Sequence, residues 1–256
     1  MPGCARQISD NVVVKETPTQ FLELEVEALR FVKKNTTIPV PEIYDIKPSA
    51  TEKDFSTLSM QYMEGEMVAR KWRFLTPAQK RTFMKMIGSF VQQLRNLKQP
   101  SDAGFIGSIE GNACYDTRVC PSKTYGPFVD ERAYNDWRIS TFDEFGNIHE
   151  PTARQLQGIR KQMSDNHRIY FTHGDISVRN VLIKVHGDGD DDVEITALLD
   201  WEQAGWRPEF WEAAKIVYGM DPHGDWCHLA REEIFPGYEN EIQLENELLL
   251  ISGPPR

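Results

Sequence analysis

The first apolar run of the chain is Val12–Val14, and Lys15 follows it directly. β-branched residues favour an extended, half-buried backbone, so this run predicts a strand. Apolar residues then recur at helical spacing and predict a helix that begins near Thr17 to Thr19; they are Leu22, Val26, Leu29 and Val32. This helix must end before Pro39, because proline disfavours helix at the residue before it.

A second strand is predicted over Phe55–Met63, and Gly65 can turn the chain after it. We therefore predict a boundary between two lobes at this point. Residues 1–65 form the first lobe, and residues 66–256 form the second.

The next helix has a strong start signal. Thr76 is a good N-cap, Pro77 suits the first helical position, and Gln79 completes a capping-box pattern. An apolar stripe at helical spacing follows and predicts a buried face; it contains Phe83, Ile87, Phe90, Val91 and Leu94. Residues 99–127 are rich in Gly, Pro, Ser and Asn and are predicted to be loop.

Residues 128–145 and 151–166 are predicted helices. Short apolar runs typical of strands follow at Ile169–Phe171, Val181–Ile183 and Ile195–Leu199. The acidic stretch between the last two runs predicts an exposed hairpin tip. Two further helices are expected, one opened by Pro208 and one over residues 238–250. The whole pattern predicts an α+β fold with a small β-sheet lobe, one helix beside it, and a larger, mainly helical lobe that contains a β-hairpin.

The composition is that of a globular protein, with 256 residues, 40% hydrophobic and 27% charged. A formal net charge of −10 disfavours nucleic acid and anionic membrane surfaces as partners. No apolar run approaches the roughly 18–20 residues of a membrane span, and no signal core opens the chain, so a cytoplasmic protein is expected. The four cysteines contain no C-x-x-C pair, which favours reduced thiols over a zinc site or disulfides. Nothing in the sequence predicts the oligomeric state.

The segment His173–Asn180 carries an Asp and an Asn five positions apart, between two predicted strands. In a tight loop both side chains can face one cleft. Asp175 could then accept a hydrogen bond from a substrate hydroxyl and direct that hydroxyl at the terminal phosphate of a nucleotide. Asn180 offers a neutral oxygen ligand to Mg²⁺. The alternative is a surface turn, because Asp, Ser and Asn are common in turns.

A second candidate is Asp200, which ends the apolar run Ala197–Leu199. A carboxylate is costly there unless it is paired or bound to a metal, so Asp200 is the best candidate for the main metal ligand. The alternative is a carboxylate at a strand end in solvent.

Lys15 is a third candidate, because a strand lysine can neutralise nucleotide phosphates and a helix glutamate can hold it by an ion pair. Glu25 is the predicted partner, and Glu23 and Glu27 lie close enough to compete. The alternative is a solvated lysine on a sheet edge.

The acidic stretch 188–192 has the alternating aspartates of an EF-hand start. However, Val193 stands where that loop needs Gly, and Leu199 stands at its twelfth position. We therefore predict a solvated hairpin tip here rather than a calcium site.

Taken in this order, the motifs make the sequence resemble the aminoglycoside phosphotransferase family, fungal members above all, which shares the protein-kinase-like fold. The matching stretches extend over nearly the whole chain: Val13–Lys15, Glu25–Val32, Ile38–Pro41, Met60–Gly65, His173–Asn180 and Asp200–Trp206. The resemblance implies ATP or GTP as the donor, Asp175 as catalytic base, and Asn180 and Asp200 as Mg²⁺ ligands. It also implies that Lys15 binds the nucleotide phosphates with Glu25 as its partner.

The resemblance further implies an interlobe hinge at Met60–Met63, where the backbone at Gln61 and Met63 hydrogen-bonds the adenine. Two departures from protein kinases favour a small-molecule acceptor over a protein. Gly174 replaces the Arg that would bind an activation-loop phosphate, and few residues lie between Asp200 and the next predicted helix. There is no room for a long activation segment.

Two functions follow from these patterns. The first is an ATP-dependent phosphotransferase that acts on a small hydroxylated metabolite. The alternative is a non-catalytic kinase-like protein that binds a nucleotide or a partner, because only 14 residues precede Lys15 and no glycine-rich segment lies in Met1–Asn11 to cover the phosphates. Acidic residues in the late helices would suit a cationic acceptor, unless they simply form a solvated face; they are Glu209, Glu212, Asp221, Asp225, Glu232 and Glu233.

Overall fold

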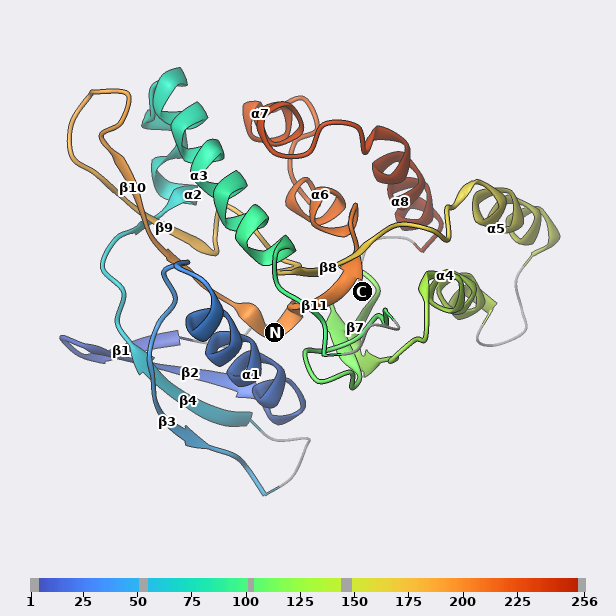
Figure 1. Ribbon diagram of the computed structural model, residues 1–256, viewed down its shortest axis with the longest axis horizontal. Helices are drawn as coiled ribbons and strands as arrows, with labels where there is room; N and C mark the ends of the chain where they lie inside the picture. The colour runs from blue at the N-terminus through green and yellow to red at the C-terminus, as the bar shows by residue number, and fades with distance from the viewer. Residues whose placement is uncertain (1–4, 51–54, 101–103, 144–148, 253–256) are drawn as a thin grey trace.

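The computed structural model describes residues 5–50, 55–100, 104–143 and 149–252. Figure 1 shows a small sheet with one helix at one end and a larger group of helices at the other. The small sheet is antiparallel, with the strand order β1-β2-β4-β3. Its elements are β1 (Ala5–Ser9), β2 (Val12–Pro18), β3 (Ile43–Lys47), β4 (Phe55–Gln61) and the helix α1 (Thr19–Asn35).

The apolar pattern explains the order within this small lobe. The stripe Leu22, Val26, Leu29 and Val32 is buried along α1, as its helical spacing predicted. Strand β1 was not predicted from the sequence. It pairs with β2 and places Ala5 opposite Lys15.

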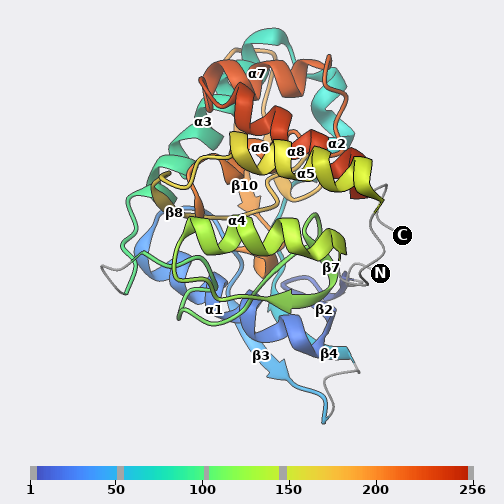
Figure 2. The same cartoon turned by 90° about the vertical axis from the view of Figure 1, so that its right-hand side faces the viewer.

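The larger part contains seven α-helices among its described residues: α2 (Val68–Lys71), α3 (Pro77–Arg95), α4 (Glu131–Ser140), α5 (Glu150–Gln162), α6 (Trp211–Ile216), α7 (Asp225–Glu233) and α8 (Glu239–Ser252). Short 3₁₀ turns lie at η1 (Trp72–Phe74), η2 (Thr141–Asp143) and η3 (Trp201–Gln203). In the side view of Figure 2, α4 lies closer to the small sheet than α5 does. The predicted capping box of α3 is confirmed, with Gln79 N–H donating to Thr76 at 3.1 Å and the Gln79 side chain accepting from the Thr76 N–H.

Short antiparallel strands run between these helices: β5 (Glu66–Met67), β6 (Cys114–Asp116), β7 (Cys120–Tyr125), β8 (Ile169–Thr172), β9 (Val181–Val185), β10 (Val193–Leu198) and β11 (Gly205–Pro208). They pair as β10-β9-β5, β11-β8 and β6-β7. Strand β5 follows β4 in the chain but pairs with β9. The chain therefore changes sheet between Gln61 and Glu66.

Three buried tryptophans, Trp201, Trp206 and Trp211, fix the segment after β10 in the core. Each indole N–H has an acceptor: Leu198 O at 2.9 Å, Ile109 O at 3.2 Å and the Asp116 carboxylate at 2.9 Å, respectively. Because buried indole N–H groups need partners, these bonds hold the chain in register on both sides of η3.

The small lobe touches the larger one through α1. The ring of Phe21 stacks on Tyr115 of β6 with a centroid distance of 3.8 Å. One residue earlier, Gln20 Nε2 donates to Ser122 O at 3.2 Å. The helix that carries Glu25 is thus packed against the β6–β7 hairpin.

Two expectations about these elements are wrong, and one helix was missed. Residues 99–127 do not form a loop throughout, because β6 and β7 pair within them. Pro208 does not open a helix: it ends β11 opposite Ile169, where its missing N–H is tolerated, and α6 begins at Trp211. Helix α7 was not predicted. Residues 221–224 before it include Asp, Pro and Gly, which are common in turns, and this turn was not recognised as the start of a new helix. Among the described helices, none is both long and apolar enough to cross a bilayer.

Candidate active site

The segment His173–Asn180 forms a loop between β8 and β9, and Glu212 of α6 holds its backbone. The Glu212 carboxylate accepts from His173 N–H at 2.7 Å and from Gly174 N–H at 3.2 Å. Burial raises the pKa of Glu212 to about 7, while the two N–H donors favour the ionised form. From the sequence, Glu212 was one of six late acidic residues expected either to suit a cationic acceptor or to form a solvated face; it is instead buried and supports the loop.

The His173 ring ties this loop to the end of β10. Asp175 N–H donates to Nδ1 at 3.0 Å, so the ring proton is on Nε2, which donates to Leu199 O at 2.9 Å. Burial lowers the pKa of His173 to about 4, so the ring is neutral at physiological pH. These two hydrogen bonds of the His173 ring set the distance between the backbone of Asp175 and that of Leu199, the neighbour of Asp200.

Gly174 is required by the backbone at this point. Its φ is 77°, and a Cβ built on it would lie 2.7 Å from Gln203 O. A side chain would therefore meet both backbone strain and a clash. The same residue that distinguishes this loop from that of protein kinases packs directly against η3.

Asp175 and Asn180 are brought together by the loop. Asn180 Nδ2 donates to Asp175 O at 2.9 Å and to Asp175 Oδ2 at 2.8 Å. These two bonds fix the amide so that Asn180 Oδ1 faces away from Asp175. Burial raises the pKa of Asp175 to about 6, although Lys215 and the Asn180 amide favour its ionised form. Asp175 is thus ionised at neutral pH and a stronger base than an exposed aspartate.

Lys15 lies among three carboxylates. Its Nζ is 2.8 Å from Glu25 Oε1, 2.8 Å from Asp200 Oδ1 and 3.3 Å from Glu202 Oε2. Burial opposes the charge of Lys15, but these carboxylates together hold its pKa above its ordinary value. Of the two competitors for the lysine, Glu23 and Glu27, neither is within ion-pair distance in the described structure.

Asp200 differs from the other members of this cluster in its exposure and its backbone. Its side chain is 47% exposed, against 5% for Lys15 and 2% for Glu25. Its φ of 61° is the only positive value among the described non-glycine residues. Such a conformation costs on the order of 1–2 kcal/mol and is concentrated at functional sites. Its carboxylate can therefore reach a ligand in the cleft while one oxygen still contacts Lys15.

The available donors fit Mg²⁺ bound together with a nucleotide. The Asp200 carboxylate and Asn180 Oδ1 are oxygen ligands, which Mg²⁺ prefers. Within the described residues no group of three His, Cys, Asp or Glu side chains is arranged to hold a metal ion. Phosphate oxygens and water would have to complete the coordination, as is usual for Mg²⁺ at nucleotide sites.

The predicted hinge residues border a cavity of about 300 Å³, and its lining includes Asn11, Gln61 and Met63. Gln61 N–H donates to Glu42 O at 2.8 Å, and Tyr62 N–H donates to Asn11 O at 2.9 Å. Within the described residues the Met63 N–H has no such partner. A hydrogen bond from this stretch to a ligand could therefore come from Met63 N–H but not from Gln61 N–H.

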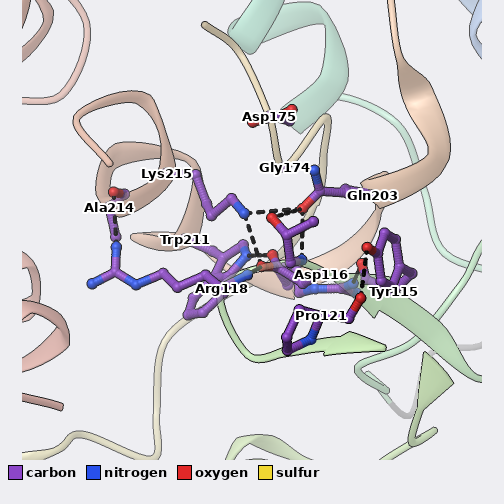
Figure 3. A network of polar contacts seen from close by, with 12 residues as sticks. Tyr115, Asp116, Arg118, Pro121, Gly174, Asp175, Gln203, Trp211, Ala214 and Lys215 are labelled. Carbon is purple, nitrogen blue, oxygen red and sulfur yellow. Dashed lines mark hydrogen bonds and ion pairs between the residues drawn. The ribbon is translucent and has the colours of Figure 1, made fainter. Parts of the chain in front are cut away.

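A polar network beside Asp175 was missed by the sequence analysis (Figure 3). Lys215 Nζ lies 2.8 Å from Asp116 Oδ1 and 3.0 Å from Gln203 Oε1, and both charged side chains are wholly buried. Burial alone would raise the pKa of Asp116, but Lys215 holds it below its ordinary value. The signal in the sequence was a lysine within the apolar run Trp211–Val217; Asp116 gave none, because it lies in the supposed loop.

Of the six late acidic residues, Glu212 lies beside Asp175 but is buried on the loop backbone, and others lie elsewhere. Asp225 pairs with Lys80 at 2.5 Å, and Glu233 pairs with Arg81 at 2.7 Å, both on the face where α7 meets α3. As a set they do not form a pocket for a cationic acceptor.

A family model described as the phosphotransferase enzyme family matches residues 7–242. The structure of wild-type aminoglycoside 2'-phosphotransferase-IIIa in its GDP complex has a TM-score of 0.66, with 11% identity over 98% of this chain and 81% of that one. The GDP and kanamycin complex of APH(2")-IIIa has a TM-score of 0.64, with 10% identity over 97% and 79%. At these identities the likeness concerns the fold, and it confirms the α+β, protein-kinase-like fold expected from the sequence.

A curated relative is the Clavilactone A biosynthesis cluster protein Y of Ampulloclitocybe clavipes. It is 23% identical over 218 residues, which cover 72% of this chain and 50% of the relative. The chain therefore spans about half the length of that protein.

Proposed function

Because the chain belongs to the phosphotransferase enzyme family, we propose that it transfers the terminal phosphate of ATP or GTP to a hydroxyl group of a small molecule. One observation carries the proposal. Lys15 contacts Glu25 and Asp200 at 2.8 Å across the two lobes, beside the loop on which Asn180 binds Asp175.

Asp175 is the catalytic base in this proposal. It accepts the proton of the acceptor hydroxyl as that oxygen attacks the terminal phosphorus, and the bond from this phosphorus to the leaving nucleotide oxygen breaks. Its pKa of about 6 supports the role, because the carboxylate is ionised at neutral pH yet more basic than usual. Asn180 keeps one Asp175 oxygen fixed by its 2.8 Å bond and leaves the other for the hydroxyl.

Lys15 binds the nucleotide phosphates, and Glu25 keeps it in place. Lysine has three N–H donors, and all three carboxylates of the cluster now surround them, so a phosphate oxygen must replace one carboxylate. Asp200 is the most exposed of the three and is the one we expect to exchange. It would then hold Mg²⁺ with Asn180, and the metal would neutralise phosphate charge.

The hinge would bind the adenine. We propose that Met63 N–H donates to the base and that Gln61 contributes its backbone carbonyl, because its N–H is already bonded to Glu42. The cavity of about 300 Å³ beside these residues supports this position for the base.

The acceptor is a hydroxylated small molecule. A structural relative that binds kanamycin supports a hydroxylated amine as one candidate class. In this proposal the small lobe of residues 1–65 binds the nucleotide and the lobe of residues 66–256 binds the acceptor.

The alternative is a kinase-like protein that binds a nucleotide without transferring phosphate. It is favoured by the sequence Met1–Asn11, which contains no glycine-rich segment to cover the phosphates. A phosphate site without such a cover admits water, which should reduce both the affinity for the nucleotide and the rate of phosphate transfer.

One experiment separates these functions. Purified protein with MgATP and a panel of amino sugars, amino alcohols and antibiotics should release ADP only with a true acceptor. Asp175→Ala should reduce this turnover by about a thousandfold or more, whereas Asp190→Ala on the exposed hairpin tip should leave it unchanged. Stabilisation by MgATP without turnover on any compound would support the alternative, and full activity of Asp175→Ala would refute the role of Asp175.

A further inference from the structure

The side-chain amide of Gln203 is held in one orientation. Its Oε1 accepts from Thr117 N–H at 3.0 Å, from Thr117 Oγ1 at 3.1 Å and from Lys215 Nζ at 3.0 Å. Turning the amide over would set its NH₂ group against three donors, one of them charged. Oxygen and nitrogen are therefore assigned by the network itself.

The buried pair Asp116–Lys215 keeps Lys215 at this oxygen. Asp116 binds the ammonium at 2.8 Å through Oδ1 and accepts from Trp211 Nε1 at 2.9 Å through Oδ2. Trp211 and Lys215 stand one turn apart on α6, so the same helix face presents both groups to Asp116. Neither charged side chain of the pair is exposed, so solvent competes little for these bonds.

With Oε1 fixed, Gln203 Nε2 faces Asp175 (Figure 3). The backbone and Cβ of Gln203 lie against Gly174, the residue before Asp175. Gln203 is 96% buried, since 4% of its surface is exposed, and Nε2 makes no hydrogen bond within the described residues. Nε2 is not among the fully buried side-chain atoms that lack a partner, so this donor stays accessible to a ligand or to water at the site.

We propose that Gln203 Nε2 donates a hydrogen bond to an oxygen of the acceptor, and that the Asp116–Lys215 pair is a positioning device that keeps this amide turned towards Asp175. The inference rests on the proposed function, since it assigns the acceptor-binding donor of the same site. It also narrows the acceptor class. Besides the hydroxyl that reacts at Asp175, the acceptor carries a second oxygen nearby that accepts a hydrogen bond, as in polyols and sugars.

The test compares acceptor and nucleotide kinetics in Gln203→Met, which keeps the volume and removes the amide. The acceptor is a panel compound that gives ADP release with the wild-type protein, and kanamycin is the first compound tried. We expect the acceptor KM to rise roughly three- to tenfold, as for loss of one neutral hydrogen bond, with the KM for ATP unchanged.

Gln93→Met is the matched control. Gln93 Oε1 also accepts from the N–H and Oγ1 of a single threonine, Thr37, at 2.8 and 3.0 Å, but on α3. The chemical change is the same, so the control should leave both KM values unchanged.

The positioning role needs a second variant, because Lys215→Met alone leaves Asp116 buried and unpaired and can fail to fold. The paired change Asp116→Asn with Lys215→Met removes both charges. It should raise the acceptor KM as Gln203→Met does, and adding Gln203→Met to it should cause no further rise, because the three residues act as one unit.

An acceptor KM within twofold of wild type in Gln203→Met, or an equal rise in the KM for ATP, would overturn the inference while wild-type turnover still upheld the proposed function. If no compound gives turnover, the proposed function fails separately. A crystal structure of the paired variant then decides the positioning role: a turned or split Gln203 side chain supports it, and an unmoved side chain contradicts it.

Discussion

At the scale of single residues, the site depends on two backbone positions that no local sequence rule requires. Gly174 must be glycine because Gln203 O lies where a side chain would begin, and Asp200 adopts a φ of 61° although it carries a side chain. The sequence motifs predicted which residues matter here. They could not predict that Gln203 is close to Gly174, because 28 residues of the chain lie between the two.

The pKa of Asp175 predicts the pH dependence of turnover. Because its pKa is about 6, the base is ionised above that pH and protonated below it. The value of kcat/KM for the acceptor should therefore fall about tenfold for each pH unit below 6. A pH–rate profile measured from pH 5 to 8 checks this, and a flat profile down to pH 5 would rule out Asp175 as the base.

The same raised pKa predicts a cost in stability. The folded state binds a proton more tightly at Asp175 than the unfolded chain does, so the stability contribution present at low pH is lost as pH rises from about 4 to 6. Asp175→Asn should therefore have an unfolding free energy roughly 1–2 kcal/mol above that of wild type at pH 7.5, and hence a higher melting temperature. At pH 4 its melting temperature should be no higher than that of wild type. Thermal unfolding at both pH values measures this; a variant less stable at pH 7.5 would contradict it.

At the scale of elements, α6 organises the site although it contains only Trp211–Ile216. Its Glu212 binds the backbone of the loop His173–Asn180, and its Lys215 and Trp211 bind Asp116. The sequence predicted a helix here from its apolar positions but placed its start at Pro208. It also missed β6, β7 and β11, because their pairing partners, and hence their strand character, are set by tertiary contacts rather than by local composition.

Glu212→Gln tests the contribution of α6. Its single oxygen can still accept from both N–H groups, as Glu212 Oε2 does, but its NH₂ group replaces the second oxygen and opposes the Gly174 N–H. We expect a loss of about 1–3 kcal/mol in unfolding free energy and a fall in kcat larger than any change in the KM for ATP. Urea unfolding and steady-state kinetics measure both effects.

Glu232→Gln is the control, since Glu232 lies on the exposed face of α7 and pairs with Arg81 at 3.3 Å. A Glu212→Gln protein as stable and active as this control would show that the loop does not depend on α6.

At the scale of the whole molecule, the negative charge of the chain favours binding of a nucleotide together with a metal ion over binding of the nucleotide alone. The chain has a net charge of −10, and Lys15 faces three carboxylates in the cleft. A nucleotide triphosphate without a metal would add negative charge to this surface. The family and the two-lobed order were predictable from the sequence, because the motifs keep their order over nearly the whole chain. The proposed acceptor side was not predictable, because it is built from Asp116, Gln203 and Lys215, which are distant in the chain and meet only in the fold.

Thermal shift should therefore show that metal and nucleotide bind together. Mg²⁺ alone should leave the melting temperature unchanged, because the described residues contain no group of three metal-binding side chains. MgATP at about a hundred times its Kd should stabilise the protein by about 2.7 kcal/mol, and ATP with a chelator by much less. Equal shifts with and without Mg²⁺ would contradict the assignment of Asn180 and Asp200 as ligands.

The contact between Phe21 and Tyr115 joins the part of the molecule that we propose binds the nucleotide to the part that we propose binds the acceptor. Phe21 stands one helical turn before Glu25 on α1, and Tyr115 stands next to Asp116 on β6. A shift of α1 on nucleotide binding would therefore press on Tyr115, which precedes Asp116 on β6. By thermodynamic linkage, each substrate should then change the affinity for the other by the same factor. Binding of the two substrates should accordingly be coupled, and the stack of Phe21 on Tyr115 should set how large that coupling is.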